Sequence, residues 1–459
     1  MESELLRIND ELRSELRQLR LRVEQLEAEN ARLKQQLVDA ERQIGELERA
    51  NARQAAPFRR RESKKVPPEK KKRSGRKPGH RGACRAVPPQ VDLEIEVPLR
   101  ECPCCGGAVE DRAPLVQYIE EIPPVRPQVI RLTTWHGECL RCGRVHSSHP
   151  LKTSTAGGAA QVQLGPRALA LAALLNKRHG LTMRTTCQVL KKVLGLSITP
   201  GGLSQALDRV ADKVESQYDA LIEKIRGSRA VFADETSWWV DGPSWWLWTF
   251  TTEDGTLYRV DKSRGSQVVR EVLGEEFTGM LVSDCLASYD PVDYRKHKCI
   301  AHHLRAIAKA RDQPDTPDPS YLDRWKVFFK TVSILYGLRP LLSDEDFAAK
   351  RAHLENTCKR LLDEPRTQPG DVAVQNRLLK QWPHLLGCLY EPAAEPTNNR
   401  AERALRPAVI ARKVSCGNRT ARGKRTWEIL ASLGATCAQN AIDFVDYLIP
   451  HLPLAPHAG

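Results

Sequence analysis

The chain has 459 residues, which is too long for one compact domain and predicts about three, and its formal net charge of +14 favours a nucleic acid partner. The sequence contains no run of ~18 apolar residues and its amino terminus is charged, which argues against a membrane-spanning helix or a signal peptide and predicts a soluble, cytoplasmic protein. Its 13 cysteines are too few for a disulfide scaffold in so long a chain.

Residues 1–50 carry a heptad repeat. The d positions are Leu5, Leu12, Leu19, Leu26, Leu33, Ala40 and Leu47, and the a positions are Asn9, Leu16, Val23, Asn30, Leu37 and Ile44. Asn30 favours a parallel two-stranded register, because two Asn side chains then satisfy each other. We therefore expect a leucine zipper that forms a homodimer, or a higher assembly, through residues 5–47. A single amphipathic helix packed on its own domain is the alternative.

Residues 51–90 lose this periodicity and are rich in Lys, Arg, Pro and Gly, so we expect a disordered basic linker. Residues 57–85 alone hold 13 Lys and Arg against 2 Glu. We expect Arg76, Lys77 and Arg81 to contact DNA phosphates, either nonspecifically or from the minor groove. A merely solvated linker is the alternative.

Residues 91–150 contain two Cys-x-x-Cys-Gly sequences, the spacing of a structural zinc site. The expected Zn²⁺ ligands are Cys102, Cys105, Cys139 and Cys142, although Cys104 competes with Cys105 for the second position. Between them, Val116 to Trp135 is rich in β-branched residues, as in the strands of a zinc ribbon. Four unligated core cysteines are the alternative to a metal site.

Residues 160–226 have helical periodicity with joints at Gly180 and Gly195, and a long third helix is expected to begin at Thr199-Pro200. Three helices with short joints suit a helix-turn-helix-like DNA-binding segment. A helical spacer between the zinc ribbon and the next domain fits the pattern nearly as well.

Residues 228–312 predict a three-stranded meander, a helix, a buried strand and a second helix. The strands are expected at 230–239, 244–252, 256–262 and 278–284. Asp234 lies on the first strand and Asp284 ends the fourth. This order is that of a ribonuclease H-like core, in which the first and fourth strands are adjacent and would bring the two carboxylates together.

Residues 313–395 have an amphipathic helical pattern and are expected to form an all-helical insertion, before the core resumes over residues 396–450. The resumed part opens with Asn398 to Arg412, a predicted helix that carries Glu402 in its first turn. The chain is thus expected to be multidomain, with an α/β ribonuclease H-like core preceded by a coiled coil, a zinc ribbon and a helical segment. Three acids that converge on one site suit divalent metal.

Three segments resemble the insertion sequence 66 family of transposases. They are Ala233-Asp234-Glu235-Thr236 with the Trp-rich hairpin that follows, Ser283-Asp284 with Tyr289, and Asn399-Arg400-Ala401-Glu402-Arg403 up to Arg412-Lys413. The zipper, basic linker, paired cysteine motifs and helical segment also follow the family's order.

The resemblance implies a DDE transposase in which Asp234, Asp284 and Glu402 hold two Mg²⁺ ions. Such an enzyme binds double-stranded DNA at the element ends and at the target, cleaves phosphodiesters and transfers the cut strand, and accessory transposition proteins are implied as partners. We expect five basic residues around Glu402 to meet DNA phosphates: Arg400, Arg403, Arg406, Arg412 and Lys413.

Several alternatives remain open on sequence alone. Glu235 and Asp290 compete with the neighbouring acids as ligands, although alternation allows only one of Asp234 and Glu235 to face the site. Cys299-x-x-His302 favours a packing role over metal binding, and the five tryptophans from Trp238 to Trp248 favour sheet core over base stacking. The alternative functions are an inactive, zipper-dimerised DNA-binding protein and a metal-dependent nuclease that does not join strands.

Overall fold

The computed structural model describes residues 25–26, 28–32, 35, 85–110, 113–149, 162–313 and 316–452. The chain divides into two compact units, Met1–Tyr118 and Ile119–Gly459, and the division falls inside the segment expected to be a zinc ribbon. Most of the expected zipper, together with Arg76, Lys77 and Arg81, lies outside the described residues. The zipper residues that are described, at 25–26, 28–32 and 35, are helical and exposed.

The strands expected between the two cysteine motifs are not formed. Residues 113–135 make no ladder with another strand, and Pro123, Pro124 and Pro127 have no backbone N–H to donate. Strands occur instead around the second motif, where β1 (His136–Cys139) pairs antiparallel with β2 (Gly143–His146). The prediction of strands within Val116–Trp135 was therefore wrong.

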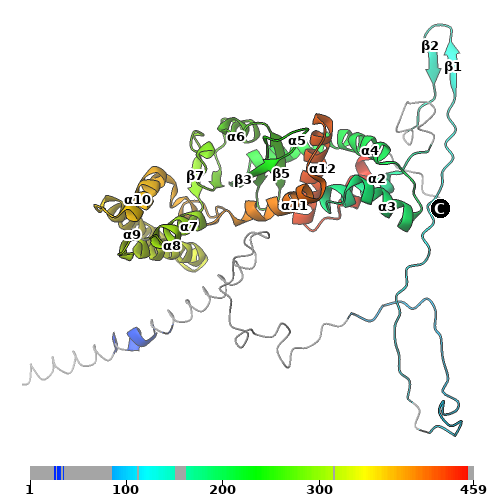
Figure 1. Ribbon diagram of the computed structural model, residues 1–459, viewed down its shortest axis with the longest axis horizontal. Helices are drawn as coiled ribbons and strands as arrows, with labels where there is room; N and C mark the ends of the chain where they lie inside the picture. The colour runs from blue at the N-terminus through cyan, green and yellow to red at the C-terminus, as the bar shows by residue number, and fades with distance from the viewer. Residues whose placement is uncertain are drawn as a thin grey trace, which may run out of the picture. The chain divides into compact units, whose positions relative to one another are not determined.

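A five-stranded mixed sheet forms the centre of the second unit (Figure 1). Its strands are β3 (Ala230–Trp238), β4 (Trp245–Thr251), β5 (Thr256–Asp261), β6 (Met280–Ser283) and β7 (Arg295–Lys298). The order is β5-β4-β3-β6-β7, with the first three strands antiparallel and β3, β6 and β7 parallel. The predicted meander and the predicted neighbourhood of the first and fourth strands are both confirmed.

Strand β7 was not predicted, because its sequence Arg-Lys-His-Lys has no apolar alternation. Arg295 is exposed, but Lys296, His297 and Lys298 are buried all the same, through polar contacts. Lys296 Nζ donates to the carbonyls of Val292 at 2.6 Å and Asp290 at 2.9 Å, and the fully buried Lys298 forms an ion pair with Asp290 at 3.2 Å. Paired cations replace hydrophobic burial in this strand, so hydrophobic periodicity could not reveal it.

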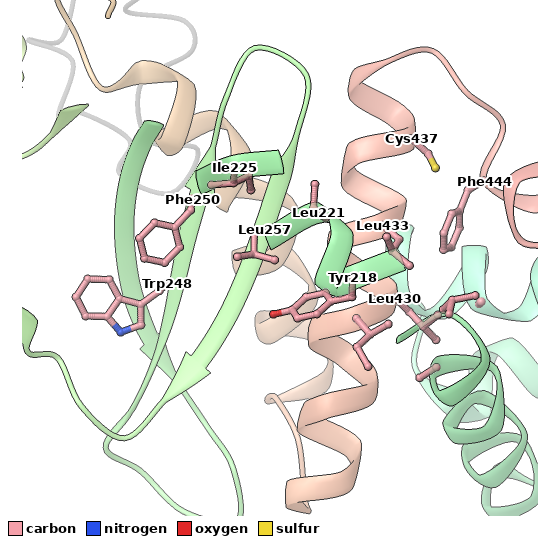
Figure 2. Close-up of a cluster of buried hydrophobic side chains, with 14 of the residues drawn as sticks. Tyr218, Leu221, Ile225, Trp248, Phe250, Leu257, Leu430, Leu433, Cys437 and Phe444 are labelled. Atoms are coloured by element: carbon pink, nitrogen blue, oxygen red, sulfur yellow. The ribbon is translucent and has the colours of Figure 1, made fainter. Parts of the chain in front are cut away.

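The helices before the sheet are α2 (Pro166–Ala173), the π-helix η2 (Leu174–Arg178), α3 (Met183–Leu194), α4 (Pro200–Lys213) and α5 (Glu215–Arg226). The long third helix expected from Thr199 is in fact two, since the backbone leaves helical geometry at Val214. Figure 2 shows Tyr218, Leu221 and Ile225 of α5 buried with Trp248 and Phe250 of β4, in a cluster that also includes residues of α2 and α4. This shared core supports the helical-spacer interpretation of the segment.

The remaining helices are α6 (Ser266–Leu273), α7 (Ile300–Arg311), α8 (Ser320–Leu338), α9 (Asp344–Asp363), α10 (Pro369–Gln381), α11 (Asn399–Ser415), α12 (Ala421–Gln439) and α13 (Phe444–Leu448). Helices α8, α9 and α10 occupy the segment expected to be an insertion. They share a separate core with α7, built around Trp325, Phe329 and Cys358. Every helix that the structure describes is too short or too polar to cross a membrane.

The edge strand β5 is covered by side chains of α12. Glu428 Oε1, Ser432 Oγ and Thr436 Oγ1 recur every four residues along the helix, and they accept the backbone N–H groups of Val260 at 2.6 Å, Tyr258 at 2.8 Å and Thr256 at 3.1 Å. One face of a helix therefore takes the place of a neighbouring strand. An edge satisfied in this way cannot pair with another chain.

Candidate active site

Asp234 and Asp284 lie on adjacent parallel strands. The register pairs Val231 with Leu281 and Phe232 with Val282, and its continuation brings Asp234 level with Asp284, just beyond the end of β6. Asp284 Oδ1 accepts the N–H of Leu286 at 2.9 Å, which turns the chain away from the sheet. Because β3 and β6 are in register, the two carboxylates lie at the same edge of the sheet.

Helix α11 covers the face of the sheet from which Asp234 projects. The buried residues Phe232 and Val282 on that face pack with Ala401 of α11, whereas Val231 and Ala233 contribute to the core on the opposite face. Glu402 follows Ala401 in the first turn of α11. The face assignments place the third acid on the same side of the sheet as Asp234.

Asn398, the residue before α11, connects the elements that carry the acids. Its backbone N–H donates to Cys299 Sγ at 3.1 Å at the start of α7, and its side-chain Nδ2 donates to the carbonyl of Ala233 at 2.8 Å, beside Asp234. The N–H of Glu402 in turn donates to the Asn398 carbonyl at 3.1 Å. Asn398 is fully buried, so these hydrogen bonds fix the start of α11 against β3 and α7.

The pKa of Asp234 is raised by its surroundings. Burial raises the pKa of Asp234 well above its usual range, and the negative charges of Glu235, Asp284 and Glu402 raise it further. Like charges gathered in a desolvated site are costly unless a cation joins them. Such an arrangement is typical of a functional site.

Glu402 forms an ion pair with an arginine of the protein, Arg305. Arg305 of α7 donates to Glu402 Oε1 at 3.2 Å, and the Glu402 side chain is 31% exposed. Among the described residues, no three His, Cys, Asp or Glu side chains meet closely enough to hold one metal ion together. The oxygen donors Asp234, Asp284 and Glu402 suit Mg²⁺ chemically, and Glu402 would have to leave Arg305 to join the other two.

The two competing acids have other partners. Glu235 is almost fully buried and accepts hydrogen bonds from Tyr289 Oη at 2.8 Å and Arg264 Nη2 at 2.8 Å. Its side chain faces the opposite side of the sheet from Asp234, in accord with strand alternation. Asp290 forms ion pairs with Lys298 at 3.2 Å and Lys380 at 3.3 Å. Both acids are engaged in structural contacts.

Two of the five basic residues expected to bind DNA, Arg400 and Arg412, form hydrogen bonds within the protein. Arg400 Nη2 donates to Glu395 at 2.6 Å and its guanidinium lies over the Phe232 ring. Arg412 donates to Thr236 Oγ1 at 3.2 Å and to Ser237 Oγ at 2.8 Å, which ties α11 to β3. Arg403 and Lys413 are exposed and Arg406 is half-buried.

The Cys-x-x-His and tryptophan motifs have packing roles. Cys299 is the buried acceptor of the Asn398 N–H, and burial followed by the charge of Arg305 lowers the pKa of His302. Trp248 and Trp238 are buried, and the Trp238 ring lies 4.6 Å from that of Trp427. Trp239 is 45% exposed. These positions agree with the preference for packing over metal binding or base stacking.

The two cysteine motifs have the same local geometry, each within its own unit. Gly106 and Gly143, which follow the second cysteine of each motif, adopt positive φ angles of 73° and 74°. Backbone hydrogen bonds lower the pKa of the first thiol in each motif. Cys102 accepts them from residues 104 and 105, and Cys139 accepts them from residues 141 and 142. Both turns therefore favour a thiolate, the form that binds zinc.

The role of Asn398 was missed by sequence reasoning. The residue lies within the motif that carries Glu402, but a buried Asn that hydrogen-bonds a distant strand has no periodicity. The contact of Arg305 with Glu402 was missed because it joins residues on two helices separated by the insertion. The helix predicted around Arg305 and the asparagine pair before Glu402 were the available signals.

Comparison with known proteins places this site in a family context. A profile described as "Transposase IS66 family" matches residues 161–426, which include Asp234, Asp284 and Glu402. The chain is 24% identical over 289 residues to the uncharacterized protein y4qI of Sinorhizobium fredii, an alignment that covers 55% of this chain and 53% of that protein. It is 23% identical over 411 residues to the uncharacterized protein y4hP of the same organism, covering 78% of this chain and 71% of the relative. The chain thus spans about half the length of the first relative.

The Asn398 contacts predict a specific loss of stability. Asn398→Ala leaves the Ala233 carbonyl without its donor and should destabilise the protein by about 1–3 kcal/mol, measured as a fall of a few degrees in Tm. The neighbouring Asn399→Ala is the matched control and should change stability by less than about 0.5 kcal/mol. Equal Tm values for Asn398→Ala and the unmutated chain would contradict the role given to Asn398.

Proposed function

The chain belongs to the IS66 family of transposases, and from that premise we propose that it is a DDE transposase with Asp234, Asp284 and Glu402 as its catalytic acids. The observation that supports the proposal best is the parallel register of β3 and β6, which brings Asp234 level with Asp284, with α11 packed on the same face of the sheet. The pKa of Asp234 is raised by burial and by the charges of Glu235, Asp284 and Glu402, which agrees with this placement. The strand order, three antiparallel strands followed by two parallel ones, supports a ribonuclease H-like core.

The proposed reaction has two phosphoryl transfers. In the first, water attacks a phosphodiester at the element end, a P–O bond to the water oxygen forms, and the P–O3′ bond breaks to leave a 3′-hydroxyl. In the second, that 3′-hydroxyl attacks a target phosphodiester and a target 3′-hydroxyl leaves. A pair of Mg²⁺ ions, when bound, supplies activation of the attacking oxygen and stabilisation of the leaving oxygen.

The protein's own residues prepare the site for this chemistry. Asp234 and Asp284 offer carboxylate oxygens at one edge of the sheet, and the hydrogen bonds of Asn398 hold the start of α11 near them. Glu402 joins them when it leaves Arg305. The released guanidinium of Arg305 is then available to a DNA phosphate, in place of the carboxylate it has lost.

We further propose double-stranded DNA as the substrate and a dimer or higher assembly as the active form. The basic linker, with Arg76, Lys77 and Arg81, and the exposed Arg403 and Lys413 would supply phosphate contacts. The heptad repeat over residues 5–47 would supply the dimer contact. Accessory transposition proteins are further proposed partners.

A structural Zn²⁺ site is proposed for Cys102, Cys105, Cys139 and Cys142. The support is the matched geometry of the two motifs, each with a positive-φ glycine and a first cysteine whose pKa is lowered by backbone hydrogen bonds. Four thiolates would leave no open position, so this metal would stabilise folding and take no part in catalysis.

The proposed function is tested by incubating the full chain with element-end DNA, a target plasmid, Mg²⁺ and the accessory proteins that the system requires. We expect cut ends and joined product from the unmutated protein. Asp284→Asn removes a proposed ligand and should abolish both, a loss of at least about 10³-fold, with DNA binding retained. The control is Asp293→Asn, at an exposed acid two residues before β7, which should be as active as the unmutated chain.

The same assay separates the alternatives. Cleavage without joined product would indicate a nuclease. DNA binding without cleavage, unchanged by Asp284→Asn, would indicate an inactive DNA-binding protein. Either result from the unmutated chain would contradict strand transfer.

The zinc proposal predicts one zinc ion per chain, measured by elemental analysis of the purified protein. Cys105→Ser and Cys139→Ser should each remove the ion, because three thiolates bind Zn²⁺ far more weakly than four. Cys104→Ser should retain it. A zinc content that is lost in Cys104→Ser but kept in Cys105→Ser would overturn the assignment of ligands.

A further inference from the structure

The last part of α10, in the helical insertion, contacts the loop that follows Asp284. Lys380 Nζ lies 3.3 Å from Asp290 Oδ2, and Gln381 Nε2 donates to Asp290 Oδ1 at 3.4 Å. These contacts fix one face of α10 against the active-site loop. Arg377 lies three and four residues before these two positions, so it projects from the same face one turn earlier.

The guanidinium of Arg377 lies among residues that surround the proposed catalytic acids. Burial raises the pKa of Cys285, which follows Asp284, and the charge of Arg377 and a hydrogen bond from its side chain act to lower it. Burial also lowers the pKa values of His302 and His303 on α7, and Arg377 contributes to both shifts. The positive charge therefore lies close to Cys285 and to the face of α7 that carries Arg305.

Arg377 has no acidic partner. It makes no ion pair with any residue in the described part of the chain, and its Nε is buried without a hydrogen-bond partner. By contrast, nearby Lys298 and Lys380 both pair with Asp290, and Arg305 pairs with Glu402. A half-buried guanidinium with an unsatisfied donor is destabilising unless an anion completes it.

We propose that Arg377 binds the DNA phosphate that lies against Asp284 and Glu402, so that the helical insertion supplies part of the active site. The proposal rests on the proposed function, since a substrate phosphate supplies the missing anion. Arginine suits the role because its planar fork donates to two phosphate oxygens at once. The guanidinium would offset the charge that builds up on the phosphate during transfer.

A purely structural arginine would have different properties. It would pair with a carboxylate or backbone carbonyls, and its removal would lower stability. The unpaired Nε of Arg377 instead predicts that an uncharged side chain of similar length costs no stability.

The test uses the full chain with Arg377→Met and Arg377→Lys, and Arg360→Ala on the exposed face of α9 as the matched control. Single-turnover cleavage of element-end DNA and Tm are measured for each. Arg377→Met should cut about 10²–10³-fold more slowly, with Tm unchanged or raised. Arg377→Lys should recover part of the rate, and Arg360→Ala should match the unmutated chain.

A neutral methylphosphonate at the cleaved position identifies the phosphate. It should slow the unmutated chain strongly but slow Arg377→Met much less, because the charge contact is already lost. Additive effects, a rate for Arg377→Met equal to that of Arg360→Ala, or a lowered Tm for Arg377→Met would each overturn the proposal while leaving the proposed function intact. If the unmutated chain does not cut, the proposed function fails and the role of Arg377 falls with it.

Discussion

Repulsion between carboxylates is the constraint on which the arrangement of this site depends. Burial and three neighbouring acids raise the pKa of Asp234, so the folded chain must hold charges together that would separate in water. The parallel register of β3 and β6 brings in Asp284, and the buried side chain of Asn398 fixes the start of α11. Arg305 relieves part of the repulsion by pairing with Glu402.

Four of the basic residues near Glu402 divide into two groups with different environments. Arg400 and Arg412 hold α11 to Glu395 and to the end of β3, so they stabilise the helix that carries the third acid. Arg403 and Lys413 are exposed, where DNA phosphates could reach them. The basic composition of this segment therefore has a structural origin as well as a proposed DNA-binding one.

Sequence reasoning was most successful where one simple period governs the structure. The meander, the strand ending at Asp284 and the helix at Glu402 follow from alternation, turn residues and capping. Strand β7 and the Asn398 contacts were missed because buried polar residues satisfied by hydrogen bonds leave no hydrophobic pattern. The strands expected in Val116–Trp135 were wrong because β-branched composition records only a preference for extended backbone, and residues 113–135 form no β-ladder.

The central claim is that Asp234, Asp284 and Glu402 act as one metal site, and Mn²⁺ binding followed by electron paramagnetic resonance tests it most directly. We expect saturable binding to the unmutated chain, weakened about tenfold or more by Asp234→Asn and by Glu402→Gln. Asp293→Asn should bind as the unmutated chain does. Unchanged Mn²⁺ affinity in Glu402→Gln would contradict the claim, because α11 would then contribute no ligand.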